Sequence, residues 1–518
     1  MLQNQNAKAT GSRYVTTPIY YLNGAPHLGH AYTTIIADFM TRFWRLSGYK
    51  THFLTGTDEH GQKILESAAK NKMAVEDFVD TMSSAFSAMT TATGADADDF
   101  IRTTEKRHIK GATALWENLR EKGHIYKGTY KGWYAVRDEA FYKESDIKNG
   151  LAPTGAPVAW VEEPCFFFRL SAFQGKLLDF YSAHPDFILP RERAHEVISW
   201  VKSGLIDLAI SRSTFSWGIP VPHTTKHVMY VWIDALTNYI NALGYPENTP
   251  LLKTFWPEAR HIIGKDILRF HAIYWPAFLM AADLLPPKHL YVHGWWTVEG
   301  EKMSKSLGNV LDPHDLIRAY GLDVIRYFLL REVPFGGDGD FSEAALKKRL
   351  NADLANDLGN LLQRVLGFIQ KKIKCVPNQP SEKEGCPFAN WQTGLYQKLE
   401  GLVDSAMPSR YLEHLWRGVA LGNQFMDKLE PWVLQKSTKT EDQKKLHAGL
   451  YRLLDLLRLV AIYLQPVMPE SAKRMLKQLG YEGEPLSLIN PAFTLNPGSP
   501  LTKPEPLFQK DTPNVRTG

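Results

Sequence analysis

Two histidines near the start of the chain have the spacing of a phosphate-binding pair. His27 and His30 are three residues apart, just after a turn and at the start of an apolar helical pattern. Residues at this spacing share one face of a helix, and the free backbone N–H groups of a first turn favour an anion. Gly29 between them has no side chain, so a ribose or a flat ring can lie against the backbone. The pair predicts a nucleotide-phosphate site, although ordinary polar residues at a helix start would give the same pattern.

A carboxylate and two lysines extend this hypothesis. Asp58 follows a short apolar run, 52–55, that is typical of a buried strand. Doubly wound sheets bind ligands beyond the carboxyl ends of such strands, so Asp58 is a candidate to hold an ammonium group. Lys302 and Lys305 lie in a loop bounded by glycines, and such a loop can close on a polyphosphate and open again. A polar turn and a solvated surface loop are the simpler interpretations of these two motifs.

Alternating strand and helix patterns indicate a parallel sheet. Helical patterns separate short apolar or β-branched runs at 14–17, 52–55, 99–103, 227–233, 261–263 and 289–293. This order predicts an α/β fold, a doubly wound parallel sheet whose strands are joined by crossovers. Short aromatic strands with Gly and Pro turns replace the pattern over 124–212, which predicts an inserted subdomain.

The pattern becomes helical from about residue 341 to about residue 479. Leucines and valines recur at helical spacing over 350–365 and 450–464, which predicts a helix bundle. The resulting division is a disordered tip over 1–13, the sheet domain over 14–123 and 213–298, the insertion over 124–212, a lysine loop and linker over 299–345, the bundle over 346–486 and a tail over 487–518.

The first helix of this bundle carries a polar ridge. Asn356, Asn360 and Arg364 recur every fourth position beside the leucine stripe, where they can form hydrogen bonds with base edges. Trp432 lies at the end of another helical pattern, and an exposed tryptophan can stack on a base. A solvated helix face and a core tryptophan are the alternatives.

The composition is that of an ordinary globular protein. Of 518 residues, 44% are hydrophobic and 22% charged, and the net charge of +5 favours a polyanionic partner only weakly. No apolar run approaches the roughly 18 residues of a membrane span. Three scattered cysteines, Cys165, Cys375 and Cys386, are too few for a disulfide framework or a four-cysteine zinc site, and they suit a reducing cytosol.

The pairing of HLGH at 27–30 with KMSKS at 302–306 resembles the two signatures of the class I aminoacyl-tRNA synthetases. The chain from residue 14 to about 486 is similar to their methionyl-tRNA synthetase family, of the bacterial or organellar type. Besides the bundle residues named above, the similarity is carried by PIYYLNGAPHLGH at 18–30, TGTDEHG at 55–61, MYVWIDAL at 229–236 and IGKDILRFH at 263–271.

The resemblance implies a Rossmann-like catalytic domain with a connective insertion, followed by an all-α anticodon-binding bundle. It implies a methionine–tRNA ligase that joins L-methionine to ATP as methionyl-adenylate and releases pyrophosphate. The methionyl group then goes to the 3′ end of tRNA(Met), which serves translation initiation and elongation. The implied tRNA carries the anticodon CAU, and Mg²⁺ should accompany ATP.

The same resemblance gives the motifs their roles. His27, His30, Lys302 and Lys305 would stabilise the charge on the phosphates, and Gly29, Gly264 and Asp266 would bind ATP together with the two lysines. Asp58 would hold the ammonium group of methionine, and aromatic rings would surround its thioether. The full methionine set is Ile19, Tyr21, Asp58, Trp232, Ala235, Leu236, Tyr239, Ile267, His271 and Trp275. The anticodon set is Asn360, Arg364 and Trp432.

The chain departs from the family pattern in three places. Its insertion lacks the cysteines of the zinc knuckles that many relatives carry, so we expect no structural zinc. Leu236 stands where some relatives have proline. No room follows about residue 486 for the dimerising module of longer relatives, so we expect a monomer. Since no presequence is recognisable, we expect the protein in the cytoplasm.

Other functions of the same fold remain open at this point. One is a synthetase for leucine, isoleucine, valine or cysteine, although the large editing insertion and the zinc ligands of such enzymes are not visible. Another is a catalytically inactive tRNA-binding relative, which would be expected to lose a signature histidine or lysine. A small nucleotidyltransferase would need neither the lysine loop nor the bundle.

Overall fold

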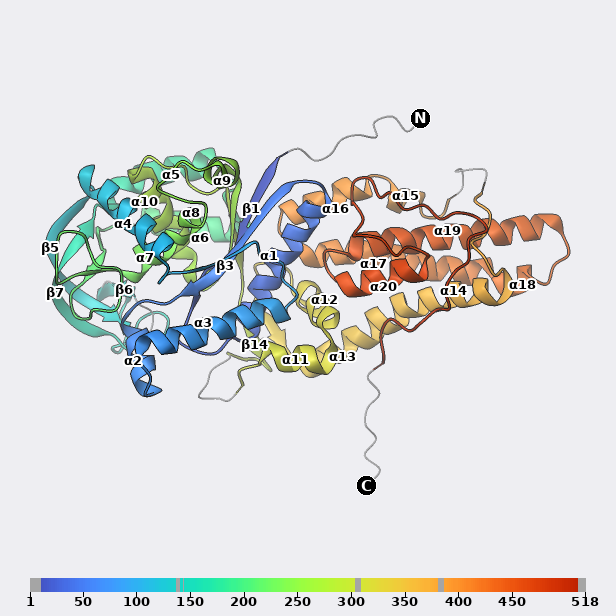
Figure 1. Cartoon of the computed structure of the whole chain (residues 1–518), viewed down its shortest axis with the longest axis horizontal. Helices are drawn as coiled ribbons and strands as arrows, with labels where there is room; N and C mark the ends of the chain where they lie inside the picture. The colour runs from blue at the N-terminus through green and yellow to red at the C-terminus, as the bar shows by residue number, and fades with distance from the viewer. Residues whose placement is uncertain (1–10, 137–139, 143, 303–308, 381–385, 511–518) are drawn as a thin grey trace, which may run out of the picture. The chain divides into compact units, whose positions relative to one another are not determined.

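The computed structural model describes residues 11–136, 140–142, 144–302, 309–380 and 386–510. The chain divides into two compact bodies, coloured mainly blue to green and mainly yellow to red in Figure 1. The α/β body comprises residues 12–37 and 51–294, and the helical body comprises residues 1–11, 38–50 and 295–518. Helix α1 (Leu28–Leu46) contributes its first turns to the α/β body and the remainder to the helical body.

A seven-stranded sheet is the frame of the α/β body. The strand order is β2–β3–β1–β12–β13–β8, with β4 paired to β3. The pairs β1–β12, β12–β13, β13–β8, β2–β3 and β3–β4 are parallel, which confirms the predicted fold class. The strands are β1 (Ser12–Thr16), β2 (Tyr20–Tyr21), β3 (Lys50–Asp58), β4 (Asp99–Arg102), β8 (Ile188–Leu189), β12 (Ala259–Gly264) and β13 (His289–His293). The first strand therefore begins within the segment that we expected to be a disordered tip.

Helices pack against this sheet and form two hydrophobic clusters. The larger cluster includes Trp116 and Trp275, and the smaller includes Phe86 and Met89. The helices of this body, besides α7 described below, are α2 (Gln62–Lys70), α3 (Val75–Ala92), α4 (Lys106–Glu121), α5 (Gln174–Ala183), α6 (Arg191–Lys202), α8 (Asn238–Asn241), α9 (Pro250–Phe255) and α10 (Trp275–Ala281). Strands and helices alternate as expected, so polar residues at the carboxyl ends of β1, β12 and β13 lie along one edge.

The segment 124–212 is not a single inserted unit. Its aromatic strands form an antiparallel sheet in the order β6–β5–β7–β9, at the end of the α/β body that lies away from β1 and β3 in Figure 1. However, β8 comes from the same segment and pairs with β13 in the main sheet. A two-residue strand gives too short a pattern to be recognised. The remaining strands are β5 (Ile125–Ala135), β6 (Ala140–Tyr142), β7 (Ala159–Phe168), β9 (Leu208–Ala209), β10 (Ser211–Arg212) and β11 (Val228–Met229).

The prediction of a strand over 227–233 was wrong for most of its length. The strand β11 ends at Met229, and helix α7 (Val231–Leu236) begins two residues later. A short apolar run fits a buried helix as well as a buried strand, and periodicity alone does not separate them. The consequence is that Trp232, Ala235 and Leu236 project from a helix.

The helical body holds the predicted bundle, in which α17 and α19 run side by side (Figure 1). The first bundle helix is not regular, because 350–359 is π-helical before α14 continues it. The helices are α11 (Pro313–Tyr320), α12 (Leu322–Glu332), α13 (Glu343–Arg349), α14 (Asn360–Lys372), α15 (Ala389–Gln392), α16 (Leu395–Asp404), α17 (Pro408–Leu429), α18 (Pro431–Leu434), α19 (Thr440–Leu464) and α20 (Pro469–Gln478), with strands β14 (Trp296–Val298), β15 (Glu301–Lys302) and β16 (Gly339–Phe341). In the described part of the chain, no helix is long and apolar enough to cross a membrane.

The segment 299–345 is more than a linker, because α12 carries a buried arginine at the centre of the helical body. Arg326 is fully buried and pairs with Asp38 of α1 at 2.7 Å. It also donates to the carbonyl oxygens of Val467 at 2.8 Å and Pro466 at 3.0 Å. A buried guanidinium is tolerated only when it is paired and hydrogen-bonded. Arg326 therefore joins the second part of α1 to the turn between α19 and α20.

Candidate functional site

The histidine pair is organised by backbone hydrogen bonds at the first turn of α1. The rings of His27 and His30 stack with centroids 3.8 Å apart, which confirms that they share one face. Nδ1 of His27 accepts from the Gly29 N–H at 3.1 Å, and Nδ1 of His30 accepts from the His27 N–H at 3.2 Å. Since each Nδ1 accepts, each neutral ring carries its proton on Nε2 and can donate from there.

Both imidazoles are neutral at physiological pH. Burial lowers the pKa of His27 to about 4, although the Asp266 carboxylate opposes this effect. Burial also lowers the pKa of His30 well below its usual range, and the neighbouring His27 adds to the shift. The pair therefore offers two hydrogen-bond donors without a fixed positive charge, which suits a phosphate whose charge changes during a reaction.

Gly29 and Gly264 occupy positions where a side chain would collide with a site residue. A Cβ on Gly29 would lie 3.0 Å from Cε1 of His27, and a Cβ on Gly264 would lie 2.5 Å from Oδ1 of Asp266. Gly264 ends β12, and the single turn 265–267 carries Asp266 directly after it. The two glycines therefore let His27 and Asp266 fold back onto the backbone at the carboxyl edge of the sheet.

A histidine at the end of the neighbouring strand fixes α1 to this edge. His293, the last residue of β13, donates from Nδ1 to the Gly294 carbonyl oxygen at 2.8 Å. Its Nε2 then accepts from the hydroxyl of Thr33 on α1, also at 2.8 Å. This bond holds the first turns of α1, and with them the histidine pair, at the sheet.

The rings of Tyr239, His261, His271 and Trp275 form an aromatic cluster in the α/β body, and hydrogen bonds fix the tautomer of His271. Nδ1 of His271 donates to the Ile267 carbonyl oxygen at 3.0 Å, so its Nε2 accepts from the Tyr239 hydroxyl at 2.7 Å. Burial lowers the pKa of His271 to about 4 and raises the pKa of Tyr239. Both groups are therefore neutral, which suits an uncharged, polarizable ligand such as a thioether.

A second buried imidazole, that of His261, packs against the Tyr239 ring. The two rings stack at 4.0 Å. Nε2 of His261 accepts from the Trp275 indole N–H at 3.3 Å, and its Nδ1 donates to the Thr16 hydroxyl at 2.8 Å. Burial lowers the pKa of His261 well below its usual range. Trp275 is fully buried, and its ring also lies near the Tyr239 ring, with centroids 6.1 Å apart.

The other predicted methionine residues lie in the same α/β body, and the Trp232 ring contacts the His271 ring with centroids 6.2 Å apart. Asp58 is buried at the carboxyl end of β3, and its backbone pairs in register with Tyr21. Trp232 stacks face to face on Phe270 at 3.7 Å. The partly buried side chains that pack against the larger hydrophobic cluster, of which Leu236, Tyr239 and Trp275 are members, include Ile19, Tyr21, Trp232 and Ile267. Ala235 is buried on α7, and its carbonyl oxygen accepts from Asn238.

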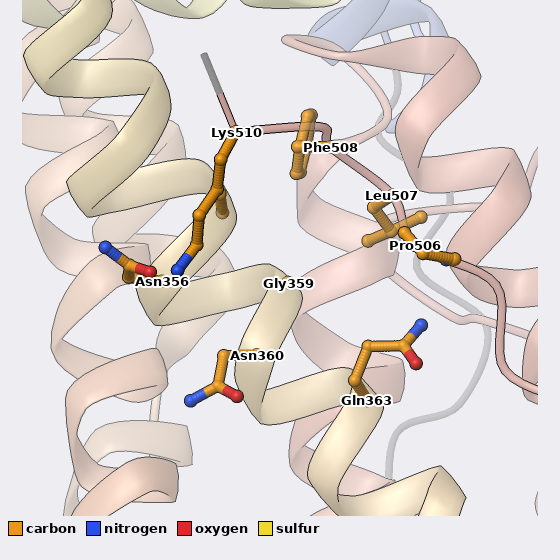
Figure 2. Close-up of a pocket in the computed structure, with 9 residues that line it drawn as sticks. Asn356, Gly359, Asn360, Gln363, Pro506, Leu507, Phe508 and Lys510 are labelled. Atoms are coloured by element: carbon orange, nitrogen blue, oxygen red, sulfur yellow. The ribbon is translucent and has the colours of Figure 1, made fainter. Parts of the chain in front are cut away.

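The predicted anticodon residues fall into two groups within the helical body. Asn360, together with Asn356 of the polar ridge, lines a groove of about 300 Å³, which Figure 2 shows between the first bundle helix and the C-terminal tail. Arg364 and Trp432 are not among the described residues that line it. Arg364 pairs with Asp427 of α17 at 2.5 Å, and Trp432 on α18 is 44% exposed. Asn356 lies in the π-helical segment 350–359, whereas Asn360 and Arg364 both lie on α14.

The lysine loop is only partly described. The backbone of Lys302 ends β15, paired with Thr297 of β14. The side chain of Lys302 and the whole of Lys305 lie outside the described residues.

Comparison with known proteins identifies the family. The model of class I tRNA synthetases (M) matches residues 13–156 and 153–366, and the model of the anticodon binding domain of methionyl tRNA ligase matches residues 396–517. This chain belongs to the methionyl-tRNA ligase family of class I synthetases. The resemblance seen in the motifs is thereby confirmed.

Individual family members are similar over nearly their whole length. The methionine–tRNA ligase of Rickettsia conorii is 48% identical over 505 residues, which are 96% of this chain and 99% of that protein. That of Brucella suis is 48% identical over 506 residues, covering 96% and 97%. The structure of Mycobacterium tuberculosis methionyl-tRNA synthetase in complex with methionyl-adenylate superposes with a TM-score of 0.93 at 45% identity, covering 96% of this chain and 99% of that one.

A buried carboxylate, Asp234, links two family motifs and was not predicted from the sequence. Asp234 accepts from Nδ1 of His60 and from Nε2 of His108, both at 2.7 Å. Burial alone would raise the pKa of Asp234, but the two histidines outweigh it and lower that pKa to about 2. His60 follows Asp58 in its motif, and Asp234 lies between Trp232 and Leu236. His108 had no local signal, since it is a single histidine in an amphipathic helix. His293, the last residue of β13, could have been found from the strand-end rule, whereas His261 lies within β12.

The buried neutral histidines of this family member predict a pH dependence of stability. The unfolded imidazoles titrate near 6.5, whereas those of His27 and His271 titrate at about 4 in the folded chain. The unfolded state therefore binds more protons between these values, and the free energy of unfolding should fall as the pH drops from about 6.5 to about 4. Each group contributes up to about 1.4 kcal/mol per pH unit.

Urea denaturation at neutral pH and near pH 5 measures this effect. A His271→Gln variant lacks one of the titrating groups and should show a smaller difference between the two conditions than the wild-type chain. Equal stability of the wild-type chain at the two pH values would contradict the neutral assignment of these imidazoles.

Proposed function

We propose that this chain activates L-methionine with ATP and transfers it to tRNA carrying the anticodon CAU. The observation that carries the proposal is the pair of stacked, neutral imidazoles at the first turn of α1, beside Gly264 and Asp266 and on the same body as the aromatic cluster. The names of the relatives, and the methionyl-adenylate bound to the M. tuberculosis protein, support the same reaction.

In the first step, the methionine carboxylate attacks the α-phosphorus of ATP. A bond forms between the carboxylate oxygen and phosphorus, the bond to the bridging oxygen breaks, and pyrophosphate leaves. His27 and His30 donate from Nε2 to the phosphate oxygens, and Lys302 and Lys305 neutralise the charge on the leaving group. Chemistry at phosphorus depends on such positioning and charge stabilisation, so no covalent nucleophile is needed.

Methionine is held by its ammonium group and by its thioether. Asp58 accepts from the ammonium, and the Tyr239 hydroxyl, whose proton points to His271, offers its oxygen and ring to the side chain. The pocket distinguishes methionine mostly by shape, and one methylene is worth only about 1–3 kcal/mol. Homocysteine and unbranched analogues should therefore be rejected incompletely.

In the second step, a ribose hydroxyl of the terminal adenosine of the tRNA attacks the methionyl carbonyl carbon. An ester bond forms, the bond from the carbonyl carbon to the phosphate oxygen breaks, and AMP leaves with the hydroxyl proton transferred to solvent. Asn360, Arg364 and Trp432 recognise the anticodon, because bases of an unpaired loop present their edges and faces to protein side chains.

If Trp432 contacts the tRNA, its replacement should affect aminoacylation of tRNA but not the activation of methionine. Trp432→Ala should lower kcat/KM for tRNA aminoacylation about 5- to 100-fold, since stacking on one base contributes about 1–3 kcal/mol. It should leave methionine-dependent exchange of pyrophosphate into ATP unchanged. Val433→Ala is the matched control, because Val433 is a 53% exposed neighbour on the same helix. Equal losses in both reactions for Trp432→Ala would count against a separate anticodon site.

Metal use follows from the same proposal. Among the residues that the structure describes, no group of three or more His, Cys, Asp or Glu side chains is placed to hold a metal ion. Mg²⁺ would accompany the triphosphate with its water shell, and it would add to the charge stabilisation there. We predict that the protein has no structural zinc, acts as a monomer and works in the cytoplasm. Metal analysis of the full chain tests the first prediction, light scattering the second and localisation microscopy the third.

Amino-acid-dependent exchange of pyrophosphate into ATP tests the proposed activity. With each standard amino acid supplied in turn, methionine should support exchange far better than any other. Exchange driven by leucine, isoleucine, valine or cysteine would identify a different synthetase, and exchange with none would indicate an inactive relative.

A further inference from the structure

The C-terminal tail forms one wall of the groove that Asn356 and Asn360 line. The described end of the chain, residues 505–510, is here called the strap. Four of its residues, Pro506, Leu507, Phe508 and Lys510, line the groove opposite the first bundle helix (Figure 2). The two walls are more than a hundred residues apart in sequence, so no local motif predicts the groove.

The strap is anchored by side chains of α20. The Gln478 amide donates to the Glu505 carbonyl oxygen at 3.1 Å and accepts from the Glu505 N–H at 3.0 Å. The Arg474 guanidinium donates to the carbonyl oxygens of Leu507 at 3.0 Å and Pro506 at 2.6 Å. The Leu507 side chain is buried. These bonds fix the backbone immediately before Phe508, so the groove wall is a built feature of the tail.

The chemistry of the groove is that of a site for a nucleotide. The Phe508 ring lies over Gly359, where an added Cβ would be 3.8 Å from the ring carbon Cδ2. Nε2 of Gln363 is buried and has no hydrogen-bond partner among the described residues. The groove therefore combines an aromatic wall, three side-chain amides and one ammonium group, from Lys510. A base needs a ring to pack on and amides for its edges, and the adjoining phosphate needs a cation.

We propose that the strap is part of the RNA-binding site: Phe508 packs against an unpaired base of the tRNA anticodon loop, Gln363 and Asn356 bind its edge, and Lys510 contacts a phosphate. This inference rests on the proposed function and extends it to residues of the tail. Figure 2 shows the Lys510 side chain extending along the groove toward Asn356. The ligand is a single-stranded RNA segment, because the edges of paired bases would not reach a groove of about 300 Å³.

Steady-state aminoacylation by the full chain tests the proposal. Phe508→Ala should lower kcat/KM for tRNA about 5- to 100-fold, and Phe508→Leu, which keeps an apolar wall, should lower it less. Gln478→Ala, which releases the anchor, should reproduce part of the loss.

Lys510→Ala should reduce the slope of log(kcat/KM) against log salt by about 0.7, the value for one phosphate contact with a single strand. Lys503→Ala removes the same charge from a tail residue outside the groove, and it should change neither quantity.

Methionine-dependent exchange of pyrophosphate into ATP distinguishes a failure of the proposed function from a failure of the strap inference. If the wild-type chain fails to catalyse exchange, the proposed function fails. If the wild-type chain charges tRNA, and the Phe508 and Lys510 variants charge it with unchanged kcat/KM and salt slope, the strap inference alone is overturned. Equal loss of exchange and charging in Phe508→Leu and Lys510→Ala would also overturn it, because the strap would then be only a structural clamp.

Discussion

Replacement of His30 by alanine is expected to slow methionine-dependent exchange of pyrophosphate into ATP by about 100- to 1,000-fold. That is the typical cost of removing one preorganised donor to a charge that develops in the transition state. Nδ1 of His30 is occupied by the His27 backbone N–H at 3.2 Å, so only Nε2 is available to a phosphate. Most of the loss should appear in kcat, since the donor acts on charge that grows during the reaction.

Two controls make this result specific to the donor. His30→Gln keeps a side-chain N–H and should recover part of the rate, whereas His289→Ala removes a histidine from the other end of β13 and should leave it unchanged. Because burial already keeps the His30 imidazole neutral, the wild-type rate should not fall as the pH rises through about 6.5. A rate that is lost over that range would show that the protonated form is required and would contradict the neutral-donor account.

The second large effect is expected at Asp58. Asp58→Asn should lower kcat/KM for methionine by about two to three orders of magnitude, because the buried ammonium group of the substrate would lose its counter-charge. The carboxylate ends β3, where it is buried and where its backbone pairs in register with Tyr21. The KM for ATP should change little, since the predicted ATP residues Gly29, Gly264 and Asp266 lie on α1 and at the end of β12 and not on β3.

A substrate analogue serves as the control for Asp58. Desamino-methionine lacks the ammonium group, so its binding, measured by calorimetry, should be the same in wild-type and Asp58→Asn proteins. If the substitution weakens the analogue as much as it weakens methionine, Asp58 shapes the pocket and does not pair with the ammonium group.

The sheet and its helices could be predicted because local patterns determine them. The strand 289–293 was located to the residue, and helix α4 begins at Lys106 as expected. The errors occurred where a pattern was short or fitted two structures. The run that was predicted as a strand over 227–233 becomes helix α7, and the two-residue strand β8 gave no signal. The π-helical turns over 350–359 are a small variation on an α-helical pattern, and hydrophobic spacing does not reveal them.

The sequence indicated candidate polar residues for the site, but it did not indicate the groups that support them. His27, His30 and Asp58 carry local signals, since they lie next to glycines and strand ends. The groups that support them depend on partners distant in sequence, as the Thr33 bond to His293 and the Asp234 bond to His108 illustrate. The strap is the clearest case, because its groove exists only once the tail has folded back on the first bundle helix.

A crystal structure of the full chain with methionine and a non-hydrolysable ATP analogue tests the central claim most directly. We expect Nε2 of His27 and of His30 within about 2.7–3.2 Å of phosphate oxygens. The Nζ atom of Lys302 or Lys305 should contact the same triphosphate, and the Asp58 carboxylate should contact the methionine ammonium group. A nucleotide bound away from the histidine pair, or lysines bound to a different ligand, would contradict it.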